Sequence, residues 1–483
     1  MISVPPFALE ICVVCVGIFL LMMDCFTKVD KLSLGWAAIS GLLAIIVLSF
    51  LTGPMPKSLI IPQDFYVVDQ PALFFKRFIL LSTILTICLA MDYAPVYERF
   101  IPSGGPQAGL GEFLILPIFT CAGLMWMVSA ADFIMIFVSL ELVTISFYVL
   151  VASMRKNTGS LEAGVKYLIL GALSTGFIVY GITWIFGVTG QTALREIRLA
   201  LPLLSQGYLV AVLFGLGLVL VSLGFKVAAV PFHFWVPDVY QGAPTPITAF
   251  LSVASKAAGF VVLLRVLEPF FVISSIEGKL LIVLTVLAAL TLIYGNLAAM
   301  PQTNLKRLLG YSSIAHAGYL LIGVASFRGG PSGPIIGFYL AGYLLMTFLA
   351  FLVLQHVARA SGSDEISDFN GLGRRSPVLA LGMLVSMLSL AGLPFTVGFL
   401  GKFFIFEAAM RSHQYLLVAI GAVTVSSGFY YYLKVVRAMY WQTAPDDAPA
   451  IAVPPFSKFL IAFLCIGIIV FGIFPQPLLA MLQ

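Results

Sequence analysis

The chain alternates between long apolar runs and short polar links. A transmembrane helix needs roughly 20 consecutive apolar residues to cross the hydrocarbon core of a bilayer, and many runs approach or exceed that length. We therefore predict an all-α polytopic membrane protein with about 14 transmembrane helices. The predicted spans are residues 7–26, 33–53, 73–92, 111–130, 132–154, 162–186, 208–230, 245–267, 278–299, 304–326, 333–357, 377–409, 413–439 and 455–480.

The composition supports lipid as the solvent for most of the chain. The 483 residues are 61% hydrophobic and only 10% charged, whereas soluble domains carry about 25% charged residues. The net charge of +5 comes from basic residues scattered between apolar runs, which argues against a nucleic-acid partner. The longest links, 54–72, 187–207 and 358–376, are too short for a soluble domain.

The predicted orientation follows from the lysines and arginines in the links. If the N-terminus lies outside, the links on the inside carry a modest excess of these residues, as the positive-inside rule requires. We therefore predict that both termini are extracytoplasmic. The N-terminus lacks the basic segment of a cleavable signal peptide, so we expect the first apolar run to span the membrane.

Four charged residues lie in the middle of predicted spans: Glu141, Lys226, Lys256 and Lys402. Each charge at the bilayer centre costs about 2.5–3.5 kcal/mol even on lenient scales. One such residue could simply join two helices or extend toward the interface, but four together favour an ion path. A site for a fixed anion would favour arginine, and lysine can release its proton. The pattern therefore predicts proton transfer.

Two of these lysines lie beside predicted helix breaks. Pro231 follows Lys226 closely, and "LAGLPFTVGFLGKFF" (390–404) contains several glycines and a proline before Lys402. Proline removes a helix hydrogen bond, and freed backbone groups at membrane depth must be buried in protein or line a wet cavity. We expect Lys402 to lie about one turn into a second half-helix.

A short internal similarity accompanies these breaks. "LVSLGFKVAAVPF" (220–232) resembles "LVSMLSLAGLPF" (384–395), and the two segments are five predicted spans apart. An odd separation reverses the direction of the chain across the membrane, so a duplicated unit would be an inverted repeat. Inverted repeats with broken helices are typical of transporters.

Histidines and a late acidic residue are weaker candidates. His316 lies mid-span and His233 lies in the first predicted break. Either imidazole could relay protons near neutral pH, although a lone buried histidine is commonly a hydrogen-bonded packing residue. Glu407 lies late in the twelfth span and is interpreted as interfacial.

Motifs for redox or nucleotide chemistry are missing from the sequence. It contains neither a phosphate-binding loop nor a dinucleotide-binding glycine motif. No cluster of metal-ligand residues and no pair of histidines typical of haem ligation occurs within one span. We therefore expect no redox centre, cofactor or metal in this chain, and expect another component to supply the energy.

Four segments resemble the antiporter-like membrane subunits of respiratory complex I, the NADH-quinone oxidoreductase. The resemblance covers roughly residues 70–480. The segments are "SLEAGVKYLILGALSTGFIVYG" (160–181), "GFKVAAVPFHFWVPDVYQGAPTPITAFLSVASKAAGF" (224–260), "NLKRLLGYSSIAHAGYLLIG" (304–323) and "SLAGLPFTVGFLGKF" (389–403). The form "PFHFWVPDVYQGAP" and the lysine at 402 resemble one branch of this family, whereas the sister subunit M typically has glutamate at that position.

The resemblance implies a fold and residue roles. Two inverted five-helix repeats, 111–267 and 278–439, would follow three N-terminal helices in 1–110 and precede a C-terminal helix in 440–483, with the seventh and twelfth helices broken. Glu141 would pair with Lys226, Lys256 would connect the two halves, and Lys402 would be the terminal proton carrier. Quinone reduction elsewhere would drive a proton from the cytoplasmic side through these residues.

The resemblance also implies partners and a location. FMN, iron–sulfur clusters and quinone are expected in other subunits, and the expected neighbours are antiporter-like subunit M and the small subunits K and J. The expected location is the bacterial cytoplasmic membrane. Three alternatives remain open: a subunit of a multisubunit cation/proton antiporter, a ferredoxin- or F420-linked relative, and a membrane scaffold without a proton path.

Overall fold

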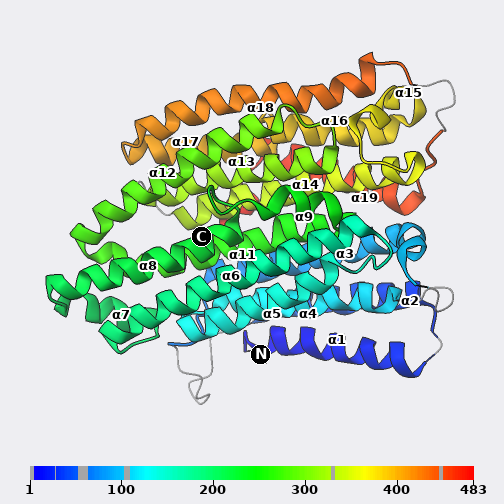
Figure 1. Ribbon diagram of the computed structural model, residues 1–483. Coiled ribbons are helices and arrows are strands. Elements are labelled where there is room, and N and C mark those ends of the chain that lie inside the picture. The colour runs from blue at the N-terminus through cyan, green and yellow to red at the C-terminus, as the bar shows by residue number, and fades with distance from the viewer. Residues whose placement is uncertain are drawn as a thin grey trace. The chain divides into compact units, whose positions relative to one another are not determined.

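The computed structural model describes residues 5–27, 29–52, 64–102, 109–327, 332–444 and 450–482. Helices dominate these residues (Figure 1), and the β-type pairing among them is limited to isolated bridges such as Tyr66–Ala130. Thirteen helices of the described part are long and apolar enough to cross a membrane. The prediction of an all-α polytopic membrane protein is confirmed.

The chain forms two compact units. Residues 1–227 and 242–282 make the first unit, and residues 228–241 and 283–483 make the second. The chain therefore leaves the first unit directly after Val227 and re-enters it at Gly242. This division by packing does not test the boundaries of the inverted repeats, which stay a prediction.

The first unit contains the helices of the first eight predicted spans. In chain order they are α1 (Ala8–Phe26), α2 (Lys31–Ser49), α3 (Gln70–Tyr97), α4 (Leu110–Ser129), α5 (Phe133–Val151), α6 (Thr158–Thr189), the short α7 (Leu194–Ala200), α8 (Gln206–Val227), α10 (Thr245–Phe250) and α11 (Lys256–Leu267). Side-chain caps fix several starts: Asp69, Asp132 and Asn157 each accept a hydrogen bond from the first turn of the following helix.

The second unit begins with the segment after the first break. Its helices are α9 (Trp235–Gly242), α13 (Leu305–Ala325), α14 (Ser332–Ser361), α15 (Leu372–Arg375), α16 (Pro377–Ala391), α17 (Val397–Arg411), α18 (Tyr415–Trp441), α19 (Pro455–Ile473) and α20 (Gln476–Ala480), while α12 (Ser274–Ala299) crosses the boundary between the units. α13 is buried at nearly every position, so it forms the core of this unit.

The twelfth predicted span differs from the others because it consists of two half-helices. α16 ends at Ala391 and α17 begins at Val397, and each is 15 residues long. Gly392 adopts a left-handed conformation with φ of 92°, a common way to end a helix. Neither half alone has the roughly 20 residues that a full crossing needs.

Candidate functional site

Lys226 lies at the end of α8, where the seventh span is interrupted. The helix stops one residue later, Ala228 has a left-handed φ of 64°, and Pro231 follows. A left-handed backbone and a proline both prevent the helix from continuing. The Lys226 side chain is buried, and its position in the last turn places the ammonium near the negative end of the helix dipole.

Threonine hydroxyls surround the charged groups of the first unit. The Lys226 ammonium donates to the hydroxyl of Thr144 on α5. Glu141 lies one turn earlier on α5, is half-buried, and accepts a hydrogen bond of 2.6 Å from Thr175 on α6. The expected direct pair is therefore absent from the described contacts of Glu141 and Lys226, although the two charges interact electrostatically.

Lys256 begins α11 directly after a π-helical turn, Leu251–Ser255. Such turns insert an extra residue into a helix and are frequent at functional sites. A Cβ atom on Gly259, one turn beyond Lys256, would lie 3.7 Å from the Cβ atom of Lys226. The eighth span therefore packs on the end of α8, and the two buried lysines lie on neighbouring helices of one unit.

In the second unit, the Lys402 side chain of α17 spans the break between α16 and α17. Its ammonium donates to the carbonyl oxygens of Leu390 and Ala391 at 2.8 and 2.9 Å. These carbonyls belong to the last turn of α16, which has no further helical turn to bond them. Lys402 lies in the second turn of α17, as expected, and is buried.

A cluster of buried hydroxyl groups surrounds His316 in the same unit. The two ring nitrogens of His316 lie 2.7 Å from the hydroxyl of Tyr339 and 3.2 Å from that of Tyr432. Tyr432 also lies 2.5 Å from the hydroxyl of Ser312. The ring of Tyr319, one turn after His316, faces the Lys402 ammonium at 5.1 Å. His316 and Lys402 therefore share a polar environment within the second unit.

His233 and Glu407 lie in different surroundings. The His233 ring packs 4.4 Å from the ring of Tyr294, and its buried Nδ1 has no hydrogen-bond partner among the described residues. Glu407 is partly exposed and forms an ion pair of 2.6 Å with the exposed Arg411, one turn later. This surface position agrees with the interfacial interpretation of Glu407.

The family assignment follows from sequence similarity. Residues 130–428 match the family described as "NADH:quinone oxidoreductase/Mrp antiporter, TM". The match covers more than half of the chain.

The chain belongs to this family. A relative named NADH-quinone oxidoreductase subunit N, from Desulfitobacterium hafniense, is 40% identical and aligns with 92% of this chain and 89% of its own length. A chain of respiratory complex I from Thermus thermophilus is 31% identical and has a TM-score of 0.79. The match covers 98% of this chain and 98% of that chain. The resemblance to complex I subunits is confirmed.

A more distant solved structure shows that the fold extends beyond complex I. A chain of the membrane-bound sulfane sulfur reductase, an archaeal respiratory membrane complex, has a TM-score of 0.85 at 23% identity and covers 98% of this chain and 95% of that chain. At this identity the likeness concerns the fold alone.

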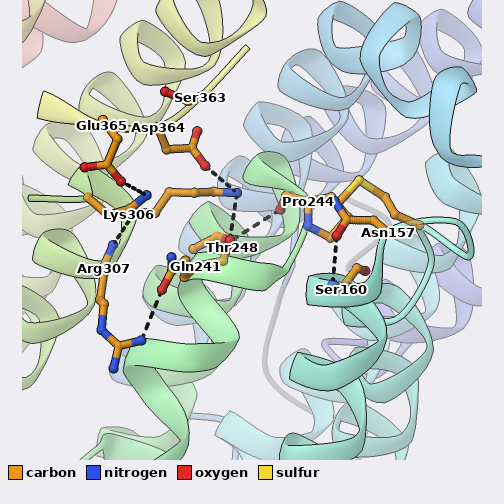
Figure 2. A network of polar contacts seen from close by, with 12 residues as sticks. Asn157, Ser160, Gln241, Pro244, Thr248, Lys306, Arg307, Ser363, Asp364 and Glu365 are labelled. Atoms are coloured by element: carbon orange, nitrogen blue, oxygen red, sulfur yellow. Dashed lines mark hydrogen bonds and ion pairs between the residues drawn. The ribbon is translucent and has the colours of Figure 1, made fainter. Parts of the chain in front are cut away.

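Two further buried cations, Lys306 and Lys76, lie near the starts of their helices, and the sequence gives no sign of their partners. Lys306, in the first turn of α13, is 3.6 Å from Asp364 and donates to the Gln241 carbonyl at 3.4 Å, while Arg307 donates to Asp238 at 2.7 Å (Figure 2 shows Lys306, Arg307, Gln241 and Asp364). These contacts hold α9 on the start of α13. No spacing rule in the sequence relates these partners, which are 58 to 69 residues apart.

The second such cation, Lys76, lies in the second turn of α3 and is 1% exposed. It forms an ion pair of 2.9 Å with Glu10 of α1. The predicted third span, 73–92, places Lys76 near its start, where a charge does not stand out as a mid-span candidate. Its helix starts three residues earlier, at Gln70, and the packing of α1 against neighbouring helices covers the charge.

Proposed function

We propose that this chain is a proton-translocating membrane subunit of an NADH:quinone oxidoreductase, and that Glu141, Lys226, Lys256 and Lys402 carry the proton. The observation that supports this most strongly is the placement of all three lysines at helix interruptions. Each is buried, and each adjoins a helix end or a π-helical turn. Ionisable groups at this depth are costly and mark ion paths by default.

The proposed transfer uses groups that already contact the lysines. Thr144 accepts from the Lys226 ammonium and lies one helical turn from Glu141 on α5, and the Glu141 carboxylate accepts from Thr175. In the proposed transfer these two hydroxyls exchange partners or pass a proton between the charged groups. A hydrogen bond to a charged group contributes about 1.5–3 kcal/mol, and a proton crossing 100 mV requires about 2.3 kcal/mol. The free energy of making or breaking one such bond is therefore comparable to the work of moving a proton across the membrane.

The wider assembly is part of the proposal. We place FMN, iron–sulfur clusters and quinone in other subunits, with subunits M, K and J as membrane neighbours. Protons would enter from the cytoplasmic side of the bacterial cytoplasmic membrane and pass Lys226 and Lys256 before Lys402, with His316 and His233 as candidate relays. Both termini would be extracytoplasmic, and residues 111–267 and 278–439 would be inverted repeats.

The test uses the assembled complex in sealed vesicles, with proton movement and quinone reduction followed together. Lys402→Ala is expected to abolish most pumping, whereas the exposed Lys166→Ala, which removes a surface pair with Glu162, should behave like the wild type. Equal proton-to-electron ratios in the wild type and in both variants would overturn the assignment of Lys402. Sodium-dependent proton movement without NADH or quinone would instead identify a cation/proton antiporter.

A further inference from the structure

A buried cluster of charged residues lies on the N-terminal helices of the first unit. It does not include Lys226 or Lys256. One carboxylate oxygen of Glu10 pairs with the Lys76 ammonium at 2.9 Å and accepts from the Tyr66 hydroxyl at 2.8 Å. Lys76 also donates to that hydroxyl, which closes a triangle. Glu10 and Lys76 are 0% and 1% exposed, so neither charge is hydrated at the surface.

The second carboxylate oxygen of Glu10 is the unusual feature of this cluster. Oε2 is buried and has no hydrogen-bond partner among the described residues. A buried carboxylate normally has both oxygens satisfied, because an unsatisfied charged acceptor is costly. Protonating Oε2 removes the negative charge from that oxygen, and a proton from Lys76 would leave two neutral groups instead of a buried ion pair.

The groups that face Glu10 come from α3, α4 and the segment before α3. Lys76 of α3 is the cation beside the carboxylate, and the start of α1 adds the positive end of a helix dipole. Tyr66 stays a neutral donor, because burial and the Glu10 charge raise the pKa of its hydroxyl. The Cys121 thiol on α4 also lies within reach of the Glu10 charge.

An ion pair nearer the surface of the first unit interacts electrostatically with this cluster. Lys76 interacts electrostatically with Asp69 and Arg265, which form an ion pair of 2.9 Å. Arg265 lines an open cavity of about 260 Å³, together with Asp64 and Val67. Val67 directly follows Tyr66 in the chain. Asp64 and Val67 lie in the segment just before α3, and this cavity is the proton entry that the proposed site would use.

We propose that Glu10, Lys76 and Tyr66 form a second proton-binding site, which exchanges protons with the membrane face where α1 begins. The site is separate from Lys226, Lys256 and Lys402, and it goes beyond the proposed function because it does not require those lysines to carry protons. A purely structural ion pair would keep Glu10 ionised at every pH at which the protein is folded.

Infrared difference spectroscopy of the assembled complex during acid titration tests this site. The wild type is expected to show a reversible band of a protonated carboxylic acid that is absent in Glu10→Gln and displaced in Lys76→Gln. The exposed Glu162→Gln should leave the band unchanged. A band that persists in Glu10→Gln would overturn the proposal and leave the pair as a structural contact.

Two further variants distinguish loss of the site from a folding defect and test how protons reach Glu10. Glu10→Gln combined with Lys76→Met removes both charges and leaves no lone buried ion, so it should assemble and lack the band. Val67→Trp fills the cavity and should slow hydrogen–deuterium exchange of the band about tenfold. An unchanged exchange rate would show that protons do not reach Glu10 through this cavity, which contradicts the proposed route.

Discussion

The substitution Gly398→Ala examines the junction of the two half-helices most sharply. A Cβ atom at this position would lie 1.9 Å from the carbonyl oxygen of Ser389, which belongs to the last turn of α16. Ordinary contacts begin near 3.4 Å, so the two backbones must separate by roughly 1.5 Å. A backbone oxygen cannot rotate away as a side chain can. Gly398 is therefore required for this close approach.

The energetic consequence follows from the contacts of Lys402. Its bonds of 2.8 and 2.9 Å to the Leu390 and Ala391 carbonyls would stretch beyond normal hydrogen-bond length. Each bond to a charged group contributes about 1.5–3 kcal/mol, and overpacking costs about 1–3 kcal/mol. We expect a destabilisation of about 2.5–6 kcal/mol if one bond is lost. A 1 Å misplacement can also slow a reaction about 100-fold.

The assay measures thermal unfolding of the assembled complex and its proton-to-electron ratio in vesicles. Gly398→Ala should unfold at lower temperature and pump poorly. The matched control is Gly176→Ala on α6, where an added Cβ meets no atom within 4 Å and helix propensity improves by up to about 1 kcal/mol. Wild-type stability and pumping in Gly398→Ala would refute the requirement for a tight junction.

Three smaller substitutions test other contacts. Thr144→Val removes the acceptor of the Lys226 ammonium and should cost about 1.5–3 kcal/mol together with much of the pumping; unchanged pumping would exclude the hydroxyl from the path. Asp238→Asn weakens a pair with Arg307 that is about one-third exposed on each side, so a calorimetric loss above about 1 kcal/mol would be unexpected. His316→Phe leaves two buried tyrosine hydroxyls short of a partner and should lower thermal stability by about 2–4 kcal/mol; an unaltered melting curve would contradict these bonds.

Much of the fold could be predicted because lipid imposes a simple rule on sequence. Each membrane span must be long and apolar, so the apolar runs in the sequence predict the helices to within a few residues. The same rule identified Lys226, Lys256 and Lys402, since a charge inside an apolar run is conspicuous. The break after Gly392 was predictable from glycine and proline, whose backbone preferences are local.

Pairing between distant residues could not be predicted. Lys76 lies near the start of its predicted span, where a charge is not conspicuous, and only the packing of α1 places Glu10 beside it. Thr144 is unremarkable in sequence until α8 brings Lys226 to it. The π-helical turn before Lys256 has no distinctive composition. These features depend on tertiary packing, which a single sequence does not specify by local rules.

The most direct test of the central claim is the proton-to-electron ratio of the assembled complex carrying Lys226→Ala, measured in sealed vesicles with quinone reduction followed simultaneously. If Lys226 carries protons, the complex assembles, and pumping and coupled quinone reduction both fall sharply. If the ratio and the turnover equal those of the wild type, Lys226 is a structural partner of Thr144, and the path through Glu141, Lys226, Lys256 and Lys402 is wrong.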